Sequence, residues 1–131
     1  MNQKVATVLV IDDVPQVTEL LARFLARADL YTVIAADGII GLRQARKLLP
    51  DLILCDANLP GLDGLDLIKW LKNAPTTAHI PIVLMSGIRC DDSGADAFLQ
   101  KPFLMTEMLA LVRSLILSRQ TNGAKDRREF L

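Results

Sequence analysis

Short apolar runs recur along the chain, and each is followed by a polar residue. The runs cover residues 8–11, 52–55, 82–85 and 97–100, and the residues directly after them are Asp12, Asp56, Ser86 and Lys101. Near-continuous apolar runs of this length are typical of strands in a parallel sheet that is covered on both faces. Because ligands of such sheets bind outside the carboxyl ends of the strands, these polar residues are expected to converge at one edge.

The segments between the runs have helical periodicity. Pro15 suits a first helical turn, and the turn at Asp37 and Gly38 precedes a second helical segment that Pro50 stops. The expected helices cover residues 15–28, 38–49, 64–73 and 104–119, and a further strand covers residues 31–35. This alternation of strands and helices predicts an α/β fold with a parallel sheet and right-handed connections.

The composition is that of one globular domain. The chain has 131 residues, of which 51% are hydrophobic, so we expect one domain with a sizeable core and no room for a second. Residues 1–119 are assigned to this domain, and the charged residues 120–131 to a mobile tail. The 15 basic and 15 acidic residues cancel, so the net charge does not indicate a nucleic-acid or membrane surface.

Apolar run lengths and cysteine content predict the cellular compartment. The early apolar run is cut short by Asp12 and Asp13, and no later run approaches the length of a membrane span. Cys55 and Cys90 are too few for a disulfide framework and are expected to be free thiols. We therefore expect a cytoplasmic protein that contacts neither membrane nor nucleic acid directly.

The polar residues at the predicted strand ends form a chemically coherent set. Asp12, Asp13 and Asp56 supply three carboxylates, Ser86 supplies a hydroxyl and Lys101 an ammonium group. Such a set can bind a divalent cation and handle a phosphoryl group. The acidic pair alone would be explained equally well as a helix cap, but the presence of Asp56, Ser86 and Lys101 favours a metal site.

Four motifs, in this order, resemble the receiver domain of two-component response regulators. They are residues 8–13 (VLVIDD), 50–56 (PDLILCD) with 59–64 (LPGLDG), 81–87 (PIVLMSG) and 94–103 (GADAFLQKPF). The resemblance covers about residues 5–119. It implies a flavodoxin-like, doubly wound sheet of five parallel strands in the order 2-1-3-4-5, in which the ends of strands 1 and 3 lie side by side.

The resemblance also implies a Mg2+ site. The implied ligands are the side chains of Asp13 and Asp56, the backbone carbonyl of Asn58 and, mainly through water, Asp12. Clustered carboxylates repel one another, and a divalent cation removes that penalty. Mg2+ fits because it accepts a site with few carboxylates and keeps several of its waters.

By the same resemblance, the chain is a signalling switch and not a conventional enzyme. Asp56 matches the family's phosphoacceptor, which a histidine kinase or phosphotransfer protein phosphorylates in the presence of Mg2+. Lys101 and Ser86 are implied to stabilise the phosphoryl group, so that the domain assists its own phosphorylation and dephosphorylation. Ser86 and Phe98 occupy the family's two switch positions.

The chain departs from the family after Ser86. Only residues 87–93 separate Ser86 from Gly94, so the fourth helix of the family is expected to be lost or reduced to a turn. Phe98 stands where many relatives have a tyrosine, and we expect it to be either more exposed or covered by the loop. The resemblance further implies that the peptide bond between Lys101 and Pro102 is cis.

The last helix carries two adjacent apolar stripes. The first contains Leu104, Met108, Leu111 and Leu115, and the second contains Met105, Leu109, Val112 and Ile116. One stripe is expected to cover the sheet, while the other is either buried by the same core or faces a partner chain. With the fourth helix lost, we expect an apolar surface around Phe98 and the last helix, through which the protein pairs with itself or a partner.

Two other functions are compatible with parts of the sequence. A haloacid-dehalogenase-like phosphatase also forms an aspartyl phosphate, but Asp56-Ala57-Asn58 lacks the second carboxylate of such enzymes, and no cap domain fits the length. A phosphate-independent pseudo-receiver would act only as a binding module. The complete set of acidic, hydroxyl and lysine residues counts against it, although the lost fourth helix suggests altered signalling.

Overall fold

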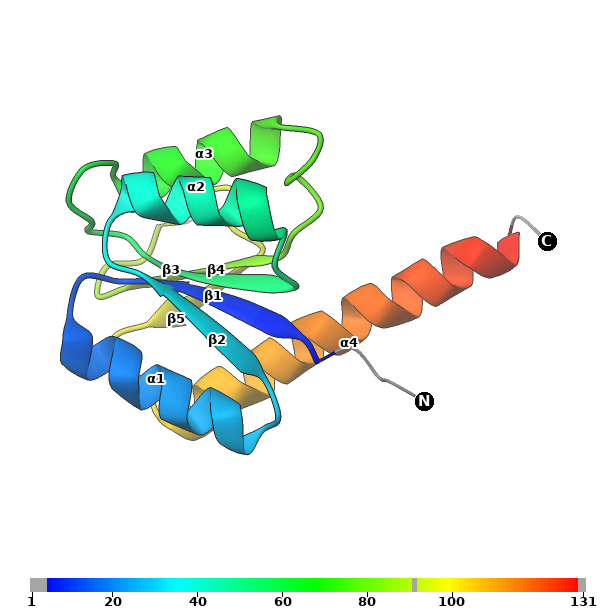
Figure 1. Cartoon of the computed structure of the whole chain (residues 1–131), viewed down its shortest axis with the longest axis horizontal. Helices are drawn as coiled ribbons and strands as arrows, with labels where there is room; N and C mark the ends of the chain where they lie inside the picture. The colour runs from blue at the N-terminus through cyan, green and yellow to red at the C-terminus, as the bar shows by residue number, and fades with distance from the viewer. Residues whose placement is uncertain (1–4, 91, 130–131) are drawn as a thin grey trace.

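The computed structural model describes residues 5–90 and 92–129, and side chains as far as residue 119. Strands and helices alternate along most of this part of the chain (Figure 1). Their bounds are β1 Thr7–Ile11, α1 Pro15–Arg27, β2 Tyr31–Ala35, α2 Gly38–Leu48, β3 Leu52–Asp56, α3 Gly64–Asn73, β4 Ile82–Ser86, β5 Ala97–Gln100 and α4 Met105–Glu129. The strands predicted from the apolar runs are confirmed.

The five strands form one parallel sheet in the order β2-β1-β3-β4-β5, as the resemblance implies. In Figure 1, α2 and α3 lie over one face of the sheet, and α1 and the first part of α4 lie over the other. The strand order reverses between β1 and β3, and Ile11 at the end of β1 is paired with Cys55 near the end of β3. The residues that follow these two strands therefore lie at the topological switch point of the sheet.

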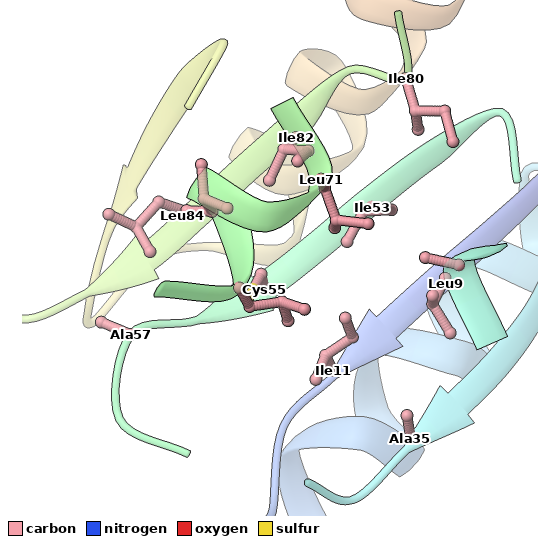
Figure 2. Close-up of a cluster of buried hydrophobic side chains, with 13 residues drawn as sticks. Leu9, Ile11, Ala35, Ile53, Cys55, Ala57, Leu71, Ile80, Ile82 and Leu84 are labelled. Carbon is pink, nitrogen blue, oxygen red and sulfur yellow. The ribbon is translucent and has the colours of Figure 1, made fainter. Parts of the chain in front are cut away.

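Burial on both faces explains why the strands are continuously apolar. Leu9 and Ile11 of β1 point into the core beneath α2 and α3 together with Ile53 and Cys55 of β3 (Figure 2). The alternate residues of the same strands face α1 and α4 on the other side of the sheet. Because successive side chains of a strand point to opposite faces, residues 8–11 of β1 and 52–55 of β3 are all apolar.

Local signals set the ends of α1 and α2. Pro15 begins α1, as its fixed φ favours, and α1 ends at Arg27. The Asp37 side chain accepts a 2.7 Å hydrogen bond from the Ile40 amide and caps α2. This helix ends at Leu48, because Leu49 adopts a left-handed conformation with φ of 48° before Pro50.

The last helix is longer than its apolar pattern predicts. The expected end near Arg119 is wrong, because α4 continues to Glu129. Residues 118–129 lack proline and contain several good helix formers, so the backbone can continue as a helix without an apolar stripe. The mobility expected for residues 120–131 stays a prediction, and residues 130 and 131 lie outside the described part of the chain.

No helix lies between β4 and β5 within the described residues 87–90 and 92–96, which form bends and a turn. The expected loss of the fourth helix is therefore confirmed. Phe98 is half-buried and packs, together with Cys90 and Ala95, against the core beneath α2 and α3. Phe98 is thus partly buried, and the apolar surface expected around it stays a prediction.

The second apolar stripe of the last helix faces the sheet. Val112 and Ile116 are buried with Met108 in the core, and Met105 and Leu109 pack against it. Residues three or four positions apart share one helix face, and this spacing places the five side chains along the sheet. Of the two alternatives for this stripe, burial by the same core is therefore the one that the structure shows, and pairing of the protein through the last helix stays a prediction.

No helix in the described residues combines the length and the apolar character that crossing a bilayer requires.

Candidate functional site

Strand ends bring the predicted site residues to one edge of the sheet. Asp12 directly follows β1, and its backbone N–H donates to the Ala35 carbonyl at the end of β2 at 3.1 Å. Asp56 and Ser86 are the last residues of β3 and β4. Lys101 follows β5, and its backbone N–H donates to the Ser86 carbonyl at 2.8 Å. The predicted convergence of these residues is therefore present.

Three carboxylates are grouped closely enough to share a cation. One carboxylate oxygen from each of Asp12, Asp13 and Asp56 lies within 4.8 Å of the others. Asp12 and Asp56 are buried, whereas Asp13 is exposed to solvent. Oxygen donors of this kind, with an open side toward water, fit a hard divalent cation such as Mg2+.

Lys101 bridges two of these carboxylates. Its Nζ donates to Asp56 Oδ1 at 2.8 Å and to Asp12 Oδ2 at 3.3 Å. The Lys101 side chain is 30% exposed, so these ion pairs are only partly screened by water. The peptide bond between Lys101 and Pro102 is cis, as the resemblance implies.

The ion pairs and burial act in opposite directions on the site's pKa values. Burial raises the pKa of Asp56 above its ordinary value; the hydrogen bond from Lys101 opposes this, and the negative charge of Asp12 adds to it. Burial alone would lower the pKa of Lys101, but its hydrogen bond to Asp56 and the charge of Asp12 outweigh burial, so that this pKa is raised. Burial thus disfavours the ionised form of Asp56, and a nearby positive charge favours it.

Asp12 also fixes the turn into α1. Its Oδ1 accepts a 3.0 Å hydrogen bond from the Val14 amide, while its Oδ2 accepts from Lys101. The residue that caps α1 is Val14, which makes no side-chain capping bond. Asp12 therefore belongs to the charged cluster, and the alternative interpretation of the acidic pair as a simple helix cap does not hold.

Ser86 is buried at the end of β4 beside the charged cluster. Its Oγ accepts a 3.1 Å hydrogen bond from the Ile88 amide, so the hydroxyl is tied to the loop that replaces the fourth helix. Phe98 pairs with Leu84 in the middle of the β4–β5 ladder and packs into the core. The switch roles of Ser86 and Phe98 stay predictions.

Asn58 lies on the exposed loop after β3. This loop is anchored at its start, because the Ala57 amide donates to the Met85 carbonyl at 3.0 Å and the Gly64 amide donates to the Ala57 carbonyl at 3.1 Å. Figure 2 shows Ala57 at the point where the chain leaves β3. The loop starts directly after Asp56, and the role of the Asn58 carbonyl as a metal ligand stays a prediction.

Two glycines near the site have a role that the sequence interpretation missed. A Cβ atom on Gly38 would lie 1.9 Å from the Leu62 carbonyl oxygen, and one on Gly64 would lie 2.2 Å from the Asp56 carbonyl oxygen. Both glycines were interpreted only as turn formers, from their Asp-Gly dipeptides. The sequence does not indicate this close approach, because the backbone atoms that each glycine contacts belong to residues elsewhere in the chain.

The cysteines, the histidine and the tryptophan stay outside the charged cluster. Cys55 and Cys90 are free, as predicted, and burial raises the pKa of the Cys55 thiol, which makes it unreactive. His79 and Trp70 are exposed. None of these residues is needed for the chemistry of the strand-end edge.

Comparison with known proteins gives consistent matches over this domain. A family profile described as "Response regulator receiver domain" matches residues 8–113. The DNA-binding dual master transcriptional regulator RpaA of Synechocystis is 40% identical over 116 residues, which are 83% of this chain and 48% of RpaA. The response regulator PleD of Caulobacter vibrioides is 42% identical over 118 residues, which are 84% of this chain and 26% of PleD. The chain thus spans half or less of these curated relatives.

A solved structure has the same fold. It is the receiver domain of the sensor histidine kinase PA1611 from Pseudomonas aeruginosa PAO1, which holds a magnesium ion in its active site cleft. The TM-score is 0.80 at 24% identity, and the match covers 86% of this chain and 98% of that one.

Proposed function

This chain belongs to the family of response regulator receiver domains, the signalling domains of two-component systems, and on that premise we propose that Asp56 is its phosphoacceptor. The observation that carries this proposal is the position of Asp56 at the end of β3, 2.8 Å from Lys101 Nζ and beside two further carboxylates. Phosphorylation of this carboxylate would replace a single negative charge by a larger group with more charge. The new group would alter the contacts of every residue around it.

The proposed reaction is a transfer of one phosphoryl group. An oxygen of the Asp56 carboxylate attacks phosphorus and forms an acyl phosphate, while the bond between phosphorus and the donor's nitrogen breaks and the electron pair stays with the nitrogen. The nitrogen then takes a proton from solvent. Loss of the phosphoryl group to water regenerates the carboxylate, and the same residues assist this step.

Mg2+ is the proposed cofactor, and the donor set fits it. Asp13 and Asp56 would hold the ion through their side chains, Asn58 through its carbonyl and Asp12 mainly through water. The bound ion would supply positive charge that offsets the charge of the carboxylates and of the transferring group. The three carboxylates with oxygens within 4.8 Å support this assignment.

Lys101 and Ser86 are proposed to hold the phosphoryl oxygens. The ammonium group of Lys101 already donates to both Asp56 and Asp12 and needs only a small movement to meet a phosphoryl oxygen. The Ser86 oxygen accepts from Ile88 but can still donate its own proton. These two donors would stabilise both the transfer and the phosphorylated product.

The proposed phosphoryl donor is a histidine kinase or a phosphotransfer protein in the cytoplasm. A largely apolar cavity of about 540 Å3 opens beside Lys101 and is lined by α1 and by the segment that leads into α4. Val17, Leu20 and Phe103 contribute to this lining. A donor protein seated there would bring a phosphohistidine close to Asp56. We further propose that the phosphorylated domain acts on a downstream protein partner.

Intact-mass measurement after incubation with acetyl phosphate tests the proposal. With Mg2+, the protein should gain the mass of one phosphoryl group, and without Mg2+ the gain should be much slower. A phosphatase would consume the donor without accumulating mass, and a pseudo-receiver would not react. Either of these results would contradict the proposed function.

A further inference from the structure

We infer that Gly38, at the start of α2, is a positioning residue for the metal site, which holds the loop after Asp56 in the conformation that binds Mg2+. Gly38 contacts no carboxylate of the cluster, and it would act through the backbone of residues 58–62. This inference rests on the proposed Mg2+ site and assigns to it a residue from a different part of the sequence.

Gly38 is buried against the backbone of the loop between β3 and α3. Its amide donates to the Pro60 carbonyl at 3.1 Å. A Cβ at Gly38 would lie 1.9 Å from the carbonyl oxygen, 2.7 Å from the carbonyl carbon and 2.8 Å from the Cβ of Leu62, whereas Cβ atoms do not approach other atoms within 3.0 Å. A methyl group there would therefore push the loop and the helix apart by about 1 Å.

The helix that carries Gly38 is held in place and cannot easily yield. Its first turn is capped by Asp37, and Gly41, one turn further on, packs closely against the Ile11 side chain in the core. Ile11 directly precedes the acidic pair at the end of β1. In this way α2 touches the end of β1, which precedes Asp12 and Asp13, and the loop that follows Asp56 (Figure 1).

The loop is fixed at both ends by contacts that do not involve α2, whereas the Pro60 carbonyl in its middle accepts from Gly38. Ala57 is bonded to Met85, and Gly64 is packed against the Asp56 carbonyl, so neither end can shift. Gly61 is exposed with φ of 82°, and the closest atoms to a Cβ there would belong to Ile39 of α2. A push from residue 38 must therefore be absorbed by residues 58–62, which include Asn58.

Mg2+ is sensitive to such a displacement. It demands near-octahedral geometry with oxygens at about 2.0–2.1 Å, whereas Ca2+ accepts longer and less regular distances. Removing a support behind a metal ligand usually weakens binding by about 10- to 100-fold. A displaced loop should therefore cost Mg2+ affinity and cost Ca2+ affinity less, whereas a general loss of stability would alter neither.

The test compares Gly38→Ala with Ala45→Gly in the full chain by calorimetric titration of Mg2+ and of Ca2+. Ala45 is buried seven residues further along the same helix, and its substitution lowers stability through helix propensity and a lost methyl group. We expect Gly38→Ala to raise the Mg2+ Kd roughly 10- to 100-fold and the Ca2+ Kd by a smaller factor. Ala45→Gly should lower Tm and leave both Kd values unchanged.

A Gly38→Ala protein that folds and binds Mg2+ with the wild-type Kd would overturn the inference. If this variant does not fold, Gly61→Ala decides, because it strains the same loop from its exposed side and should weaken Mg2+ binding with little change in folding. Wild-type Mg2+ affinity in Gly61→Ala would then overturn the inference. If the wild-type chain itself binds no Mg2+, the proposed metal site fails and this inference with it; a wild-type chain that binds normally isolates the role of Gly38.

Discussion

The side of the sheet where the strands begin (the amino edge) and the side where they end (the carboxyl edge) use the same kinds of side chain in different ways. At the amino edge, Lys72 donates to the Ala78 and Ile80 carbonyls at 3.2 and 2.8 Å and to Asp96 Oδ2 at 2.6 Å. The same Asp96 oxygen accepts from the Ile82 amide at 2.7 Å. This lysine and carboxylate tie the end of α3 to the starts of β4 and β5, so their charges are used to satisfy backbone groups.

At the carboxyl edge, the lysine meets carboxylates and not backbone groups. Lys101 lies between Asp56 and Asp12, and Asp13 adds a third negative charge nearby. One positive charge among three negative ones leaves an excess that a cation can offset. The comparison teaches that position in the fold and the balance of charge, more than residue type, separate an ion pair that satisfies backbone groups from one that leaves negative charge for a cation.

The largest predicted difference between the two edges is in the stabilisation of the protein by Mg2+. Asp13→Ala should abolish stabilisation by Mg2+, which at a concentration of one hundred times Kd amounts to about 2.7 kcal/mol. Asp51→Ala is the control, because Asp51 accepts from the Thr7 amide at the amino edge and should affect stability without affecting the Mg2+ response. Thermal melts with and without Mg2+ measure both, and an equal Mg2+ shift in all three proteins would contradict the metal site.

A second prediction concerns the amino edge. Lys72→Met should lower the free energy of unfolding by about 1–3 kcal/mol, because the Ala78 and Ile80 carbonyls and Asp96 lose their shared donor. Urea denaturation measures this loss. Mg2+ should not restore it, since no carboxylate cluster is affected. Full recovery in Mg2+ would show that the two edges do not differ in the way described.

Lys101→Met should have a smaller effect, which Mg2+ reverses. Without metal, Asp56 and Asp12 lose their common positive partner, and we expect a loss of stability of about 1 kcal/mol for this partly exposed group. A divalent cation supplies the missing positive charge. Denaturation curves of this variant in Mg2+ should therefore approach those of the wild-type chain, and a loss that persists unchanged would count against the cation site.

The smallest effect is a pH dependence. Burial raises the pKa of Asp56 in the folded protein above its ordinary value of 3.8. At a pH between 3.8 and this raised pKa, the folded metal-free protein therefore binds more protons than the unfolded chain. The contribution of Asp56 to stability is thus complete below pH 3.8 and is lost as the pH rises through the raised pKa. Asp56→Asn should remove this slope from unfolding curves recorded without Mg2+. A slope that stays the same would contradict the raised pKa.

Most of the fold was predictable because apolar periodicity reports burial on two faces. The apolar runs before Asp12, Asp56 and Ser86 predicted the central strands. The short spacing between Ser86 and Gly94 correctly excluded a helix between β4 and β5. The end of α4 was not predictable in this way, because residues 118–129 have no apolar stripe, and helix propensity alone decides there.

The site was predictable for residues that carry charge at strand ends. Asp12, Asp56 and Lys101 meet as expected, since the strand order brings the ends together. The burial of the second stripe of α4, which was one of two alternatives, and the close approach of Gly38 to the loop could not be decided from the sequence. They depend on how a helix is rotated and on the approach of two backbones, which a single sequence does not encode locally.

The most direct test of the central claim compares the two edges in one reaction. The wild-type chain, Asp56→Asn and Asp96→Asn are incubated with acetyl phosphate and Mg2+, and their intact masses are followed with time. We expect the wild-type and Asp96→Asn proteins each to gain one phosphoryl group, and Asp56→Asn to gain none. A phosphoryl group acquired by Asp56→Asn at the wild-type rate would contradict the assignment of Asp56 as the phosphoacceptor.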